Sequence, residues 1–202
     1  MKASELGIRE SDGVTDDVLA ARLRAGDPEA MGEIYDRYAD RIYNFCFRRT
    51  ASWSVAEDAM AAAFLEVWRV RGRAVAYDGE LLPWLYGVAG NVCRNSLRSQ
   101  RRQTALGAKL HLVEGGVHED DHADAVAGRV DDERRMAELV AAVEQLPEPD
   151  QQILMLVAWD GLTYQQAAEV IGVPVGTVRS RLSRSRTRLA ELMSRSDEER
   201  NR

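Results

Sequence analysis

No long apolar run occurs in this chain, although apolar residues make up 45% of its 202 residues. A membrane-spanning helix needs about 20 consecutive apolar residues, so a membrane protein is disfavoured. Residues 1–17 hold no apolar core, and we therefore expect no signal peptide. The two cysteines, Cys46 and Cys93, are too few and too far apart for a disulfide framework. Packed thiols in a reducing cytoplasm are the main interpretation, with a redox pair as the alternative.

Signatures of catalysis are missing as well. The sequence holds no Gly-rich phosphate loop, no Gly-x-Ser-x-Gly motif and no pattern of paired carboxylates in an apolar pocket. All three histidines fall within residues 105–131, which leaves acid–base chemistry poorly supplied. An enzyme is therefore disfavoured, and we expect no catalytic residue and no cofactor.

Proline and aromatic residues are scarce, with 5 prolines and an aromatic share of 6%. Ala, Leu, Arg and Glu recur at spacings of three and four, the period of helices. We therefore predict an all-α protein of two small helical domains joined by a flexible linker. The predicted boundaries are a disordered tail over 1–14, a first domain over 15–104, an acidic linker over 105–131, a second domain over 132–193 and a polar tail over 194–202.

The net charge of −6 argues at first against a nucleic-acid partner. Its distribution argues the other way, because residues 69–102 carry 7 basic and 2 acidic side chains, and residues 175–189 carry five Arg and no acid. Local field governs the docking of a polyanion, so two basic islands suit a selective DNA binder. Two solvated helix faces are the alternative.

The first domain is predicted to hold four helices. Asp27 followed by Pro28 and Glu29 is a strong helix start, and Ser54 with Glu57 is typical of a capping box. The expected helices are one near 16–23, one from 28, one from 54 and one over about 80–101. In the linker, the run from His118 to His122 has the composition of a metal site, but without a rigid scaffold a solvated linker is favoured and no metal is expected.

The second domain has the components of a helix-turn-helix. Helices are expected over about 133–145 and 149–159, followed by a short helix capped by Thr163. Ala167 is small where a neighbouring helix must cross closely, Gly172 suits a tight turn, and Pro174 opens the final helix. An ordinary αα-hairpin is the alternative.

The faces of the final helix favour DNA. At 100° per residue, Val175, Val178, Leu182 and Leu189 form a buried seam. The opposite side carries small hydroxyl side chains and one long Arg184, which suits the DNA major groove because Arg can pair bidentately with guanine. Arginines at the margins would reach phosphates. The predicted DNA contacts are Thr177, Arg179, Ser180, Arg181, Ser183, Arg184, Arg186 and Arg188.

A second polar track lies on the predicted helix over 80–101. An aromatic residue, two amides and guanidinium groups can stack on, hydrogen-bond and hold unpaired bases. The predicted contacts are Trp84, Asn91, Asn95, Arg98 and Arg102. For Trp84, a partial core position is an equally good interpretation.

Two parts of the chain resemble a known family. The stretch from Gly161 through Ala167 and Gly172 to Leu182 closely resembles region four of bacterial extracytoplasmic-function sigma factors. The runs over 56–68 and 84–97 resemble their region two. The two matches stand in the family's order, are joined by a linker of suitable length and extend over nearly all of 16–192.

This resemblance implies a protein that binds core RNA polymerase and directs it to promoters. Region four would read the −35 element through Arg179, Ser180, Ser183 and Arg184, and region two would hold the single-stranded −10 element through Asn91 and Asn95. It also implies that an anti-sigma factor holds the protein inactive. The residues expected to dock on the polymerase are Asp58, Phe64, Leu65 and Trp68.

Two departures from the family pattern stand out. Ala61 and Ala62 replace a usual Gln-acid pair, and Gly87 and Gly90 stand where the family often has Arg. Each Gly costs a helix about 1 kcal/mol relative to Ala, and both weaken the basic face. We therefore hypothesise a promoter set with a divergent −10 element.

Other functions fit the sequence less well. A conventional activator or repressor with a similar helix-turn-helix would carry a receiver or ligand-binding domain with strands. A degenerate sigma factor that only titrates a partner would not need the intact Arg face.

Overall fold

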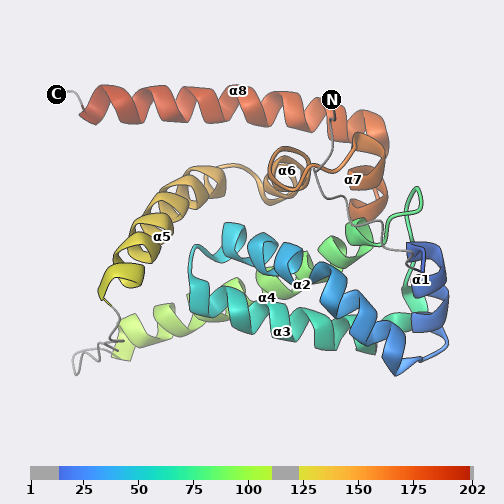
Figure 1. Ribbon diagram of the computed structural model, residues 1–202. Helices are drawn as coiled ribbons and strands as arrows, with labels where there is room; N and C mark the ends of the chain where they lie inside the picture. Colours follow the sequence, from blue (N-terminus) through green and yellow to red (C-terminus); the bar gives the residue numbers. More distant parts are fainter. Residues whose placement is uncertain (1–13, 111–122, 201–202) are drawn as a thin grey trace, which may run out of the picture.

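The computed structural model is built of helices (Figure 1). It describes residues 14–110 and 123–200, with side chains over 14–99 and 131–191. Within these ranges the backbone forms no strand, only an isolated bridge between Tyr77 and Glu80. The N-terminal unit comprises α1 (Asp16–Arg24), α2 (Pro28–Thr50), α3 (Trp53–Arg69), the short η1 (Arg71–Arg73) and α4 (Leu82–Leu110), and the C-terminal unit comprises α5 (Ala123–Glu144), α6 (Glu148–Leu154), the π-helical turn η2 (Met155–Trp159), α7 (Tyr164–Ile171) and α8 (Val175–Arg200). The prediction of an all-α protein is confirmed.

The N-terminal unit packs α2, α3 and α4 together, with α1 against α2 (Figure 1). Asp27 caps α2 as predicted, since its side chain accepts a hydrogen bond from the Glu29 amide and Pro28 is the first helical residue. The largest fully buried side chain of the described residues is Phe45 of α2, whose ring stacks on Tyr86 of α4 with 4.6 Å between centroids. This contact holds α4 against α2.

Asp16 of α1 fixes the start of α4. Its buried carboxylate accepts hydrogen bonds from the Leu81 amide at 2.7 Å and from the Tyr38 hydroxyl, and it pairs with Arg37 at 2.7 Å. Burial, followed by the bond to Asp16, raises the pKa of Tyr38 above its ordinary value, so Tyr38 is a neutral donor. One carboxylate therefore joins α1, α2 and α4.

Two local features differ from the sequence-based expectation, the cap of α3 and the extent of the helices beside the linker. The capping box at Ser54 is not formed, because α3 begins at Trp53 and Ser52 makes no side-chain cap. The Trp53 amide instead donates to Oε1 of Glu133 in α5, at 2.7 Å. At the linker, α4 continues to Leu110 and α5 begins at Ala123, so helix occupies both ends of the predicted 105–131 stretch. Ala, Leu and Arg are good helix formers, and they outweigh the scattered glycines there.

The C-terminal unit contains the predicted helix-turn-helix. Thr163 and Gln166 form a reciprocal capping box at the start of α7, and Gly172 ends that helix in the left-handed conformation with φ 76°. Ala167 is fully buried, and α8 begins directly after Pro174. Val178 and Leu182 lie in the core, with Val175 and Leu189 partly buried against it.

Among the helices of the described ranges, none is long and apolar enough to cross a membrane.

Candidate nucleic-acid and protein interfaces

The outward face of α8, here called the α8 face, consists of Arg179, Ser180, Ser183, Arg184 and Thr187, all of them exposed. The Ser180 and Thr187 hydroxyls donate to backbone carbonyls of their own helix, at 3.1 and 3.3 Å, so their oxygen lone pairs remain able to accept from a ligand. Within the described side chains, neither Arg179 nor Arg184 has a hydrogen-bond or ion-pair partner. The face is small, polar and positively charged, as a major-groove helix requires.

The remaining predicted contacts of α8 divide into two groups. Arg186 and Arg188 are exposed, whereas Thr177 and Arg181 are half-buried. The Arg181 side chain lies 3.9 Å from the Asp150 carboxylate of α6, a long and weak pair. The sequence did not single out Ser185, which is buried in the seam and donates to the Arg181 carbonyl at 2.8 Å. A serine that bonds its own helix in this way can occupy a buried position.

On α4, the structure divides the residues of the predicted polar track into exposed and buried ones. Asn91, Asn95 and Arg98 are exposed, but Trp84 is only 7% exposed and belongs to the core. The stacking role predicted for Trp84 is therefore wrong for this structure, because burial of the large apolar ring in the first turn of α4 leaves no open face for a base. The side chain of Arg102 and the run from His118 to His122 lie outside the described residues.

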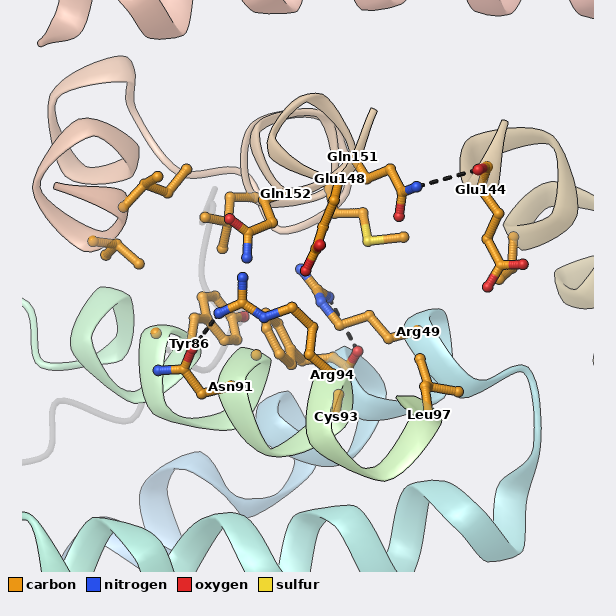
Figure 2. A pocket seen from close by; sticks show the side chains of 18 of the residues that line it. Arg49, Tyr86, Asn91, Cys93, Arg94, Leu97, Glu144, Glu148, Gln151 and Gln152 are labelled. Atoms are coloured by element: carbon orange, nitrogen blue, oxygen red, sulfur yellow. Dashed lines mark hydrogen bonds between the residues drawn. The ribbon is translucent and has the colours of Figure 1, made fainter. Parts of the chain in front are cut away.

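Arg94 is a residue of this surface that the sequence did not single out. It donates a hydrogen bond to the Asn91 side chain, one turn earlier in α4, and its guanidinium points from α4 toward Gln152 of α6 (Figure 2). Burial lowers the pKa of the Arg94 guanidinium, and the charges of Arg98 and Arg49 add to this, whereas Glu148 opposes it. The sequence offered one signal for Arg94. It stands three residues from both Asn91 and Leu97, a spacing that places side chains on one face of a helix.

A cavity of about 460 Å³ lies between α4 and the C-terminal unit (Figure 2). We call one part of its α4 wall the α4 face, namely Gly87, Gly90, Asn91, Arg94 and Arg98. Residues of α5, α6 and α7 form the opposite wall, among them Glu144, Glu148 and Val170. The basic surface of the N-terminal unit therefore faces the C-terminal unit across this cavity.

The predicted protein-docking residues lie on α3. Asp58 is exposed and the Leu65 side chain is 75% exposed, the largest exposure among the exposed large apolar residues of the described ranges. Phe64 is instead buried and packs on Tyr35 with 4.8 Å between ring centroids. Trp68 is half-buried, with the Arg71 guanidinium 4.6 Å from its ring centroid. Asp58 and Leu65 are thus available to a partner, while Phe64 supports the surface from within.

The two cysteines are both free and buried, as predicted for packed thiols. Contact with the Cys93 thiol, followed by burial, raises the pKa of Cys46. Cys46 is therefore held as a protonated thiol in the core between α2 and α4.

Comparison with known proteins identifies both units. Residues 34–103 match the family description "Sigma-70 region 2", and residues 136–189 match "Sigma-70, region 4". The first match covers most of α2 to α4, and the second covers the helix-turn-helix with its α8 face.

Full-length relatives agree with these matches. The chain is 30% identical over 182 residues to the ECF RNA polymerase sigma-E factor of Escherichia coli K12, covering 87% of this chain and 93% of that protein. It is 29% identical over 174 residues to RNA polymerase sigma factor CarQ of Myxococcus xanthus, covering 85% and 94%.

Solved structures share the fold. CnrH in complex with the cytosolic domain of CnrY aligns with TM-score 0.62 and 20% identity over 89% of this chain and 97% of that one. The sigma factor RpoE in complex with the anti-sigma factor NepR, from Bartonella quintana, aligns with TM-score 0.55 and 19% identity over 81% and 96%. From its two regions and its relatives, the chain belongs to the ECF sigma factors of the sigma-70 family, which direct core RNA polymerase to promoters.

Proposed function

We propose that α8 reads the −35 element of the promoter as duplex DNA. The observation that carries this is the α8 face, which is exposed opposite the buried Val178 and Leu182 and has cationic side chains on a surface of small hydroxyls. Arg184 and Arg179 are the base readers, with Ser180 and Ser183 beside them. Arg181, Arg186 and Arg188 contact phosphates, and Thr177 supports the helix entry.

We further propose that Asn91, Asn95 and Arg98 hold the single-stranded −10 element, with Arg102 continuing the same track. The amide side chains can hydrogen-bond base edges, and the guanidinium can hold the backbone. Arg94 joins this set because it supports Asn91 and adds a charge to the same face. Trp84 is excluded because it is buried.

Polymerase docking is assigned to α3 through Asp58 and Leu65, with Phe64 and Trp68 shaping the surface beneath. An exposed apolar side chain beside a carboxylate suits a protein partner. Regulation by an anti-sigma factor is proposed from the likeness to RpoE, which was solved with the anti-sigma factor NepR. The protein works in the cytoplasm, where its polymerase partner is found, and it is not an enzyme in its own right.

In vitro transcription tests these assignments. Core polymerase is incubated with and without the chain on genomic promoter fragments, and transcript start sites are mapped. Initiation at defined promoters that requires the chain supports the proposal. A chain that binds duplex DNA equally well without polymerase, and that never changes the start sites, is a conventional regulator and refutes it.

A further inference from the structure

Two exposed amide side chains of α4, Asn91 and Asn95, are held in different ways. The side-chain oxygen of Asn91 accepts a hydrogen bond from the Arg94 guanidinium. Asn95, one turn later, has no hydrogen-bond partner among the described residues. The amide of Asn91 is therefore fixed in one orientation, whereas the amide of Asn95 can rotate.

The chemistry of Arg94 decides which orientation Asn91 takes. A carboxamide keeps almost the same shape when a half-turn exchanges its oxygen and its nitrogen. A guanidinium carries N–H donors and no acceptor, so only the Asn91 oxygen can bond to Arg94. The reversed amide would turn its own N–H groups against a cation. In Figure 2 the Asn91 oxygen accordingly lies toward Arg94, and the nitrogen points away from it.

The Arg94 side chain is well placed to keep this bond. It stands three residues after Asn91, a spacing at which side chains of one helix meet. It is half-buried, which restricts its movement. Burial lowers the pKa of its guanidinium, but an arginine remains protonated in a protein. The donor that faces Asn91 is therefore permanent.

The fixed amide of Asn91 presents donors to a base. Its nitrogen carries two N–H groups, which have no acceptor among the described residues. An asparagine reads adenine with its oxygen and its nitrogen together, but here the oxygen faces Arg94. Guanine and thymine carry a carbonyl oxygen where adenine and cytosine carry an amino group. The outward nitrogen can bond to that carbonyl, whereas it meets an amino group donor against donor.

We propose that Arg94 is a positioning residue that makes Asn91 selective for guanine and thymine over adenine and cytosine. Asn95 can present either end of its amide and accepts both classes of base. The proposal rests on the −10 role assigned to Asn91 and Asn95. To that role it adds the chemical class of the base and the residue that sets it.

Promoter templates with a preformed bubble over the −10 element separate base reading from duplex melting. Each bubble position is changed to each of the four bases on one strand at a time, and the facing base is kept unpaired. The affinity of core polymerase with the full-length chain is measured for every template, with core polymerase alone as background. The position that Asn91 reads is the one at which Asn91→Ala removes the base preference.

At that position we expect the wild type to bind guanine and thymine templates about fivefold or more tightly than adenine and cytosine templates. Arg94→Ala should lower this ratio to below about twofold, because the amide can then turn its oxygen toward an amino group. Arg94→Lys should keep most of the ratio, since an ammonium group is also a donor without an acceptor. Asn91→Asp presents only acceptors and should reverse the preference toward adenine and cytosine.

Arg98→Ala is the matched control for charge. It removes a cation from the same face of α4, and that cation pairs with Glu148. We expect this variant to weaken binding to all templates alike and to leave the base ratio unchanged. A merely structural or electrostatic role of Arg94 would give the same result for Arg94→Ala. Circular dichroism verifies that the variants are folded.

Three results would overturn the selectivity of Asn91 while initiation on the intact promoter continues. They are a wild type without preference for guanine and thymine at the position read by Asn91, a ratio that Arg94→Ala leaves unchanged, and an Asn91→Ala variant that alters no position. If core polymerase with the wild-type chain does not initiate on the intact promoter, the proposed function fails, and the selectivity fails with it.

Discussion

The Arg184→Ala substitution separates sequence reading from phosphate anchoring on α8. Arg184 is exposed opposite the buried Val178 and Leu182, and no other described side chain bonds to it. Arg and Ala are both good helix formers. We therefore expect the free energy of unfolding to change by less than about 0.5 kcal/mol, so any loss of function belongs to DNA binding.

The size of that loss follows from the geometry assigned to Arg184. A bidentate pair with guanine contributes about 1–3 kcal/mol of discrimination against other bases. This range corresponds to about 5- to 150-fold in affinity. The loss should appear only with promoters that carry the preferred base, because the other bases never made the pair.

The assay compares holoenzyme binding across a set of promoters that differ at single −35 positions. Arg186→Ala is the matched control, since Arg186 is also exposed on α8 but lies beside the buried seam and not on the α8 face. The control should weaken binding to all promoters alike and lower the slope of log affinity against log salt by about 0.9. If Arg184→Ala instead lowers affinity by one factor across every −35 variant, the division into readers and anchors is wrong.

Three other changes test the fold and the docking surface. Asp16→Ala should lower the free energy of unfolding of the N-terminal unit by about 3 kcal/mol, because the Tyr38 hydroxyl and the Leu81 amide lose their buried acceptor; chemical denaturation measures this, and the exposed neighbour Asp17→Ala should change little. Ala167→Leu should destabilise the C-terminal unit by about 1–3 kcal/mol, because Ala167 is fully buried in the helix-turn-helix; Gln165→Leu, on the exposed side of α7, is its control. Leu65→Asp should weaken core polymerase binding by about tenfold or more, since burying one Leu contributes about 1.5–3 kcal/mol, while Leu139→Asp on α5 controls for the same change at another exposed leucine; an unchanged affinity of Leu65→Asp would remove α3 from the polymerase interface.

Local features of this fold could be predicted from sequence because their partners are neighbours in the chain. The Asp27 cap, the Thr163–Gln166 box and the Gly172 turn each depend on residues within four positions of one another. The buried seam of α8 follows from the helical period alone. These elements position the α8 face, and that candidate site was accordingly predictable.

The errors have a common cause, which is contact with residues that are distant in the sequence. Ser54 and Glu57 have the pattern of a capping box, but Glu133 from another helix satisfies the first amide of α3. Trp84 lies on the predicted polar track, yet its ring gains more from the core than from an exposed helix face. Hydrophobic period and cap motifs carry no information on such distant contacts.

Gly87 is interpreted differently once its contact with Val170 is known. From sequence it only weakens a helix and a basic face, which suggested a divergent −10 element. In the structure it faces Val170 across the interface between the two units. An arginine there would clash with α7 before it could meet DNA, so Gly87 is explained by packing without reference to promoter sequence.

The uneven distribution of charge along the chain is partly explained by the contacts between the two units. Residues 69–102 are basic in an acidic protein, and in the folded chain Asp160 and Glu148 neutralise part of the basic surface around that region. Asp160 takes up the charge of Arg48 and Arg49, and Glu148 that of Arg98. The field around these arginines is therefore weaker than the count of basic residues alone indicates, and the positive charge of the α8 face, where Arg179 and Arg184 have no described partner, is not offset in this way.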